Sequence, residues 1–134
     1  MIRGHPLFFT IAVPNGKAVV HWYTCRDLSC PGKAYYDGTP RCRGALTAKV
    51  RQLEQDGQPS AYCGHRLDQP FEKIFQFWLP QHRFWAFRGS ASRWFITNGN
   101  IKDDKHQERD YRIAEDCRKE FFSDPDTLPY RRDQ

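Results

Sequence analysis

Three short aromatic segments, close together in the chain, constrain its fold more than any other feature. Phe71, Phe75 and Phe77 all fall on odd positions of residues 71–79, so an extended chain turns them to the same side. Residues 83–88 and 93–97 repeat this pattern after short turns. The sequence therefore predicts three consecutive antiparallel strands, each with one buried side.

A basic loop and an amphipathic helix follow these strands. Lys102, Lys105 and His106 lie within residues 102–106, directly before a helix expected over residues 108–122. The buried stripe of that helix is expected to contain Tyr111, Ala114, Cys117 and Phe121. Free N–H groups at a helix N-terminus favour phosphate, so the cations and the imidazole are predicted at a place suited to a phosphate.

The first part of the chain carries a hairpin signal. Asn15-Gly16 separates two apolar segments, residues 7–13 and 18–23, which predicts an N-terminal β-hairpin. Residues 24–43 and 58–70 lack periodicity and are expected to be loops.

A helix is predicted between these two loops. Its apolar residues fall at helical spacing and are Leu46, Val50 and Leu53. Gly57 supplies a C-terminal stop, so the helix is expected over residues 44–55. Thr39-Pro40 is a candidate N-cap and first helical residue upstream.

Together these elements predict an α+β fold in a single domain, residues 1–134. A small twisted antiparallel sheet, made of the three-strand meander and the N-terminal hairpin, would pack against the amphipathic helix, and a C-terminal helix would close the domain. The core is expected over residues 7–122, and residues 123–134 are expected to be a mobile tail.

Charge and hydropathy narrow the class of protein. The chain has 21 Lys and Arg against 16 Asp and Glu, a formal net charge of +5. This excess suits a polyanionic partner, and ordinary solubilising surface charge is the alternative explanation. No segment approaches the roughly 18 apolar residues of a membrane helix, and residues 1–6 lack the apolar core of a signal peptide. We therefore expect a cytoplasmic protein without a membrane partner.

The cysteines leave two interpretations open. Their odd number fits a reducing compartment better than a disulfide framework. Cys25, Cys30, Cys42 and Cys63-Gly64-His65 contain enough soft ligands for a zinc site. However, only one loose pair has the short spacing that structural zinc sites use twice, and Cys117 falls on a helix stripe. We therefore favour buried or incidental thiols and assign no metal ligand.

Several short motifs occur in a recognisable order over residues 18–122. They are Leu53-Glu54-Gln55-Asp56-Gly57, Lys73-Ile74-Phe75-Gln76-Phe77-Trp78, His82-Arg83-Phe84-Trp85-Ala86-Phe87, residues 94–102 and Tyr111-Arg112-Ile113-Ala114. This order of helix, three-strand meander, basic loop and closing helix resembles the RelE/HigB superfamily of bacterial and phage ribosome-associated toxins. The resemblance rests on the order and spacing of the motifs.

The chain departs from the family pattern at two places. The family's first meander strand usually ends in Arg, where this chain has Trp78, and its loop usually continues with a second basic residue, where this chain has Asp103 and Asp104. Both changes remove positive charge where a scissile phosphate would lie. The N-terminal hairpin and residues 24–43 are also unusual for the family.

The resemblance implies metal-independent cleavage of mRNA, in which a ribose 2′-hydroxyl attacks the adjacent phosphate and leaves a 2′,3′-cyclic phosphate. It also implies a toxin that needs no cofactor, acts on ribosome-bound message, inhibits translation and is held in check by an antitoxin protein. Such a reaction needs a base, cations around the non-bridging oxygens and an acid for the leaving oxygen.

The resemblance also suggests roles for particular residues. Arg83 would clamp the phosphate, because a guanidinium binds phosphate bidentately. Lys102 and Lys105 hold the basic loop positions. His106 is the candidate acid or base, and Tyr111 would stack on a base or hold the attacking hydroxyl. RNA binding is assigned to Lys73, Trp78, Arg88 and Arg93.

Each candidate also has an ordinary structural interpretation. Arg83 would then pair with Glu72 or Asp68. The lysines and the histidine of the loop would be solvated surface residues, and Tyr111 would belong to the apolar core. At the level of the whole protein, two other classes stay open: a noncatalytic RNA- or ribosome-binding protein on the same fold, and a zinc-stapled interaction module.

Overall fold

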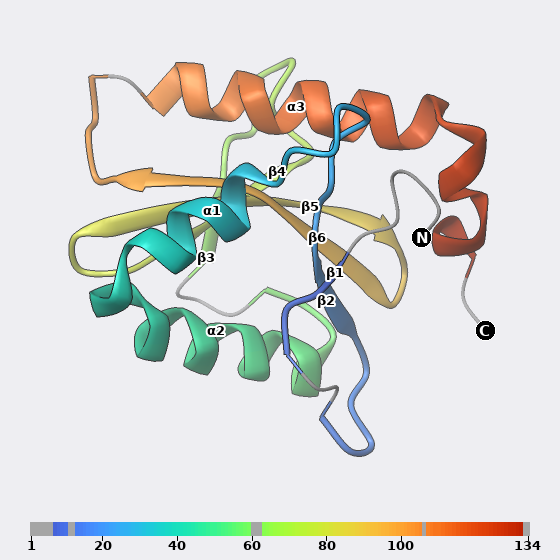
Figure 1. Ribbon diagram of the computed structural model, residues 1–134, viewed down its shortest axis with the longest axis horizontal. Coiled ribbons are helices and arrows are strands. Elements are labelled where there is room, and N and C mark those ends of the chain that lie inside the picture. The colour runs from blue at the N-terminus through green and yellow to red at the C-terminus, as the bar shows by residue number, and fades with distance from the viewer. Residues whose placement is uncertain (1–6, 11–12, 60–62, 106, 133–134) are drawn as a thin grey trace.

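A single mixed sheet with helices on both faces organises the computed structural model, which describes residues 7–10, 13–59, 63–105 and 107–132 (Figure 1). The sheet has the strand order β1-β2-β6-β5-β4-β3. The strands are β1 Leu7–Phe8, β2 Val19–Trp22, β3 Cys63–His65, β4 Ile74–Trp78, β5 His82–Ser90 and β6 Arg93–Ile101. The helices are α1 Pro31–Gly38, α2 Arg43–Asp56 and α3 Gln107–Ser123, with 3-10 helices η1 Pro40–Cys42 and η2 Pro125–Arg131.

The three aromatic segments form neighbouring antiparallel strands, as predicted. β4 pairs with β5, with Phe77 opposite Phe84. β5 pairs with β6, with Phe87 opposite Phe95. The strands are longer than predicted at the ends of β5 and β6, where backbone pairing continues past the aromatic residues.

Both faces of β5 are buried, although the alternation of aromatic residues predicted a single buried face. Phe84 and Ala86 belong to the cluster that contains the apolar face of α2. Trp85 and Phe87 belong to a second cluster, formed with the Tyr111, Ala114, Cys117 and Phe121 stripe of α3. Figure 1 shows these two helices on opposite sides of the sheet. An apolar residue at every position from 84 to 87 is what a strand covered on both sides requires.

The sheet is mixed, which corrects the prediction of an antiparallel one. β1 and β2 form the predicted hairpin, with Leu7 opposite Trp22. β2 then lies parallel to β6, with Val20 beside Trp94. The Asn-Gly signal specifies only the local partner of β2. The other neighbour is set by long-range packing, since Val20, Trp22 and Trp94 all belong to the cluster under α2.

The amphipathic helices agree with their predictions. α2 ends at Gly57, whose φ of 78° is the left-handed conformation of a C-cap glycine. The predicted stripe of α3 is buried along its whole length. None of the helices in the described part of the chain has the length and apolar content needed to cross a membrane.

Both predicted loops contain regular structure. Residues 24–43 include α1 and η1, with Thr39 at the N-cap and Pro40 at the first position of η1 as predicted. Residues 58–70 include the short strand β3. Tertiary packing holds α1, which has little periodicity of its own: Gly32 lies so close to the Trp22 ring that a Cβ would approach it to 3.1 Å.

Within the segment expected to be a mobile tail, Pro125–Arg131 form the 3-10 helix η2. The Asp124 side chain accepts a hydrogen bond from Asp126 N at 3.0 Å and caps the helix. Thr127 is buried, and its hydroxyl donates to Asp124 O at 2.8 Å. Arg131 donates to the same carbonyl at 2.9 Å. The C-terminal segment is therefore tied to the end of α3.

A substitution at Gly89 tests how tightly α3 packs on the sheet. A Cβ on Gly89 would lie 2.3 Å from Phe95 Cε2 and 3.0 Å from Phe121 Cζ, both in fully buried rings. We expect Gly89→Ala to lower the free energy of unfolding by about 1–3 kcal/mol through overpacking, measured by urea denaturation.

The matched control for this variant is Gly38→Ala. Nothing lies within 4 Å of a Cβ at Gly38, at the end of α1, so its stability should stay within about 0.5 kcal/mol of the wild type. Equal stability of the two variants would contradict the close contact between α3 and β5.

Candidate functional site

Five of the predicted site residues lie in two groups at opposite ends of β5: Trp78, Arg83 and Lys102 in one, and Lys73 and Arg88 in the other. Arg83 is near the start of this strand and Arg88 is near its end, about 17 Å away at the usual rise per residue. We call the first group the turn site, because it surrounds the turn between β4 and β5, and the second the basic cleft. The turn site contains Arg41, His82, Arg83 and Lys102, and the basic cleft contains Glu72, Lys73, Phe75, Arg88, Arg118 and Phe122.

Strand pairing brings the turn site together. Arg83 lies opposite Trp78 of β4 and opposite Asn100 of β6. Just past the end of β6, Lys102 N donates to Gln81 O at 3.0 Å. Two predicted catalytic residues and one predicted RNA-binding residue therefore meet at one end of the sheet.

Arg83 is held in place by main-chain carbonyl groups. Its Nη1 donates to Leu79 O and, at 2.8 Å, to His82 O. The alternative interpretation, an ion pair with Glu72 or Asp68, is not found among the described residues, and Asp68 pairs with Arg66 instead. Within the described ranges Nε and Nη2 of Arg83 make no hydrogen bond. One side of the guanidinium fork is thus available for a phosphate.

The sequence analysis missed His82 as a site residue. Its Nδ1 lies 2.6 Å from the Tyr35 hydroxyl, and the two rings meet edge to face with centroids 5.8 Å apart. Burial raises the pKa of the Tyr35 hydroxyl above its usual range, so it stays protonated. The contact orients the imidazole and leaves Nε2 as the nitrogen for another partner.

A cavity of about 340 Å³ opens beside His82. Leu79 and Cys42 form part of its wall, and Arg41 brings an exposed guanidinium to it. The Cys42 thiol donates to Thr39 O at 3.1 Å, and burial raises its pKa. An imidazole and a cation over an apolar wall make the cavity suited to a ligand that carries phosphate.

The loop after β6 keeps its lysines exposed. Asp103 Oδ1 accepts from Lys105 N at 3.0 Å, and Asp104 Oδ1 accepts from Gln107 Nε2 at 2.8 Å. In the part of the chain that the structure describes, neither Lys102 nor Lys105 has an ion pair. The candidate acid or base His106 lies outside the described residues.

Tyr111 lies in the core, as its position on the apolar stripe of α3 indicated. It is 3% exposed and packs against Phe71 and Trp85, with ring centroids 5.8 and 6.1 Å away. The Arg66 guanidinium covers the ring at 5.6 Å. Burial raises the pKa of the phenol. The side chain is therefore a packing element between α3 and the sheet.

A buried polar cluster joins the start of α3 to the turn site. Asn98 Nδ2 donates to Asp110 O at 3.3 Å, and Asn100 Nδ2 donates to Asp110 Oδ2 at 3.3 Å. Burial raises the pKa of the Asp110 carboxyl. Because Asn100 lies opposite Arg83, this cluster fixes the end of the sheet relative to the helix.

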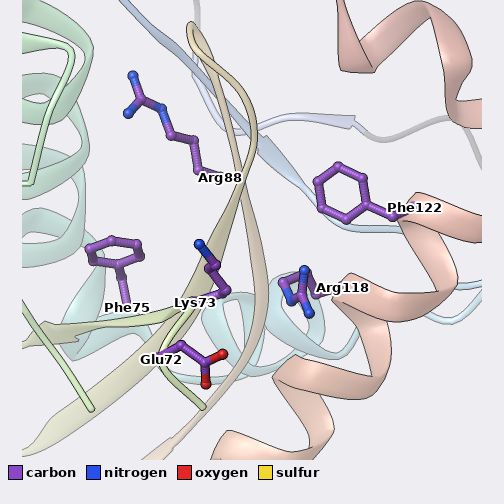
Figure 2. Close-up of a pocket in the computed structure, with 6 residues that line it drawn as sticks. All are labelled: Glu72, Lys73, Phe75, Arg88, Arg118 and Phe122. Atoms are coloured by element: carbon purple, nitrogen blue, oxygen red, sulfur yellow. The ribbon is translucent and has the colours of Figure 1, made fainter. Parts of the chain in front are cut away.

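The basic cleft is a cavity of about 400 Å³ between the start of β4, the end of β5 and the second half of α3 (Figure 2). Lys73 and Arg88, both predicted to bind RNA, line it together with Arg118. The Arg88 side chain is fixed by the carbonyl groups of the following turn and lies 5.4 Å from the Trp94 ring centre. Its lining residues carry three cations and one carboxylate, from Glu72, and Arg118 is also paired with the Glu115 carboxylate.

Arg93, the remaining predicted RNA-binding residue, faces a different environment. Its Nη1 lies 3.3 Å from His21 Nε2, and its guanidinium covers the Tyr130 ring at 5.6 Å. His21 is fully buried and stacks on Phe95. Arg93 is therefore engaged in packing at the start of β6.

The cysteines are all free thiols in this structure. Cys30 donates to Tyr23 O at 3.2 Å, and burial raises the pKa of Cys63 to about 11. Across residues 7–10, 13–59, 63–105 and 107–132, no group of three or more His, Cys, Asp or Glu side chains is arranged to hold a metal ion.

Because the His21 side chain is buried, we expect the free energy of unfolding to depend on pH. Burial, followed by the charge of Arg93, lowers its pKa from 6.5 to about 4, so the folded protein keeps the ring neutral while the unfolded chain protonates it below pH 6.5. This stability is complete above pH 6.5 and is lost as pH falls toward 4, by on the order of 2–3 kcal/mol.

The measurement is the free energy of unfolding in urea at several pH values. His21→Phe, which keeps the ring stack, should flatten the decline between pH 6.5 and 4. Lys119→Ala, at an exposed position on α3, is the control and should keep the wild-type slope. An unchanged slope in His21→Phe would show that other groups cause the decline.

Comparisons with known proteins identify no family for this chain. The scan against protein-family models found no match, and the searches of curated proteins and of solved structures found none either. Any assignment of function therefore rests on the geometry of the chain's own residues.

Proposed function

We propose that this protein is a metal-independent endoribonuclease of the RelE/HigB type that cleaves mRNA at the turn site. The observation that carries the proposal is the 2.6 Å contact between Tyr35 and His82, which orients the imidazole. The guanidinium of the next residue, Arg83, donates to the His82 main-chain carbonyl at 2.8 Å at the same end of the sheet. A proton acceptor and a guanidinium at the same end of the sheet are the two kinds of group that attack by a 2′-hydroxyl requires.

In the proposed reaction, His82 carries its ring proton on Nδ1, which donates to the Tyr35 hydroxyl oxygen, and Nε2 removes the proton of the ribose 2′-hydroxyl. The 2′-oxygen then forms a bond to the adjacent phosphorus, and the bond from phosphorus to the 5′-oxygen breaks. Arg83 and Lys102 stabilise the charge on the non-bridging oxygens, and Arg41 binds a neighbouring phosphate. The leaving 5′-oxygen takes a proton from the ammonium group of Lys105 in the loop after β6.

The order of elements supports the family part of the proposal. β2, two helices, the β4-β5-β6 meander, a loop with two lysines and α3 follow one another in the order on which the resemblance rests. The net charge of +5 suits RNA on the ribosome. A protein antitoxin that covers the turn site is part of the proposal.

RNA binding without cleavage is the second candidate. Trp78 occupies the position where the family usually has Arg, and its indole is 44% exposed. Its Nε1 donates to Gln76 Oε1 at 2.6 Å, which fixes the ring next to Arg83. A fixed, exposed indole is suited to stacking on a base and adds no charge for catalysis.

A translating bacterial extract distinguishes the two candidates. We expect the wild-type protein to cleave messages in this extract and to leave 2′,3′-cyclic phosphate ends. His82→Asn should reduce the cleavage rate about 10²-fold or more while RNA binding is retained, because only proton transfer is lost. Tyr35→Phe should cause a smaller loss and shift the pH profile.

Lys119→Ala is the control for general loss of charge, because Lys119 is exposed on α3 outside both sites. It should cleave at the wild-type rate. Binding of RNA by the wild-type protein without cleavage of any message would favour the second candidate. Full activity of His82→Asn at equal protein concentration would remove His82 from the mechanism.

A further inference from the structure

Two cysteines from distant parts of the chain meet beside α3. Cys25 lies in the segment between β2 and α1, and Cys117 lies on the buried side of α3. Both line a cavity of about 380 Å³. Cys25 is half-buried, whereas Cys117 is 7% exposed. A small reagent from solution therefore reaches Cys25 more easily than Cys117.

Glu120 holds the segment that contains Cys25 against α3. Its Oε1 accepts a hydrogen bond from the Tyr23 hydroxyl at 2.6 Å and another from Arg26 N at 3.0 Å. The chain on both sides of Cys25 is thus attached to the helix (Figure 1). Glu120 and Cys117 are three positions apart on α3 and share one face of it. The fold itself therefore places Cys25 beside Cys117.

The two thiols are in contact and differ in acidity. A hydrogen bond from the Cys117 thiol lowers the pKa of Cys25, while burial acts in the opposite direction. The same contact and burial raise the pKa of Cys117. The thiolate is the reactive form of cysteine, so Cys25 is the nucleophile of the pair and Cys117 keeps its proton.

Carboxylates surround the approach to this pair. Asp27, Asp116 and Glu120 line the cavity. Arg26 is the one cation among the described lining residues, and its guanidinium lies 3.4 Å from the Asp124 carboxylate. This charge repels an anionic reagent such as glutathione disulfide, whereas a small neutral oxidant such as hydrogen peroxide is not repelled.

We propose that Cys25 is a modification site that reacts with hydrogen peroxide and that Cys117 resolves the product as a disulfide. The Cys25 thiolate attacks one peroxide oxygen, so an S–O bond forms, the O–O bond breaks and hydroxide leaves. The Cys117 sulfur then attacks the Cys25 sulfur. An S–S bond forms, the S–O bond breaks, and the hydroxyl group leaves as water with the Cys117 proton. The sulfur atoms are oxidised, the peroxide is reduced, and the segment after β2 becomes covalently tied to α3.

Peptide mapping of the purified protein tests this reaction, which does not depend on the proposed function because neither thiol belongs to the turn site. The reduced protein is treated with hydrogen peroxide, its remaining thiols are blocked with N-ethylmaleimide, and the digest is analysed by mass spectrometry. We expect a Cys25 peptide linked to a Cys117 peptide, a loss of two of the five free thiols, and recovery of both with dithiothreitol. Glutathione disulfide at the same concentration should form this bond about tenfold more slowly.

Cys117→Ala should stop at the sulfenic acid, which dimedone labels at Cys25, and Cys25→Ser should leave Cys117 reduced. Cys30→Ser is the control, because Cys30 is also half-buried and is the cysteine nearest to Cys25 in the sequence. It should still give the linked peptide. A wild-type map that links Cys25 to Cys30, or that shows no disulfide at Cys25, would overturn the proposal, and this result does not require any variant to fold. Faster formation of the bond with glutathione disulfide would overturn the assignment of peroxide as the oxidant.

Discussion

Burial of both sides of β5 is the constraint on which the rest of this structure depends. Trp85 and Phe87 face α3, while Phe84 and Ala86 face α2. Each large aromatic side chain removes on the order of 150–250 Å² from water, so neither side of this strand is stable when exposed. Two helices from distant parts of the sequence must therefore cover it. Their positions leave the two ends of β5 as the places where polar side chains collect.

The ends of β5 share a physical device. At one end the carbonyl groups of Leu79 and His82 hold Arg83, and at the other the carbonyl groups of the next turn hold Arg88. A guanidinium held by the main chain loses less conformational freedom when it binds phosphate than a free side chain would. Both ends therefore present preorganised cations, and the turn site also has an imidazole that Tyr35 orients.

The periodicity of apolar residues predicted the helices and strands well. It failed where a residue packs against a partner that lies far away in the sequence. The meander, α2 and α3 follow from alternation and helical spacing that are visible locally. The parallel contact of β2 with β6 and the position of α1 depend on packing with residues far along the chain. The pair of Tyr35 and His82 was missed for the same reason, since the two residues are 47 positions apart and Tyr35 lies in an aperiodic segment. At Tyr111 the helical pattern indicated the core, while the family resemblance pointed to a site.

Binding of RNA at the turn site is the central claim, and NMR titration tests it most directly. A ¹⁵N-labelled sample would be titrated with a short 2′-O-methyl RNA. The account predicts shifts of the amides of Gln81, His82 and Lys102 at the turn site. The amide of Arg51, on the exposed side of α2, should not move. Shifts confined to α2 or to the β1-β2 hairpin, with none at the turn site, would contradict the account.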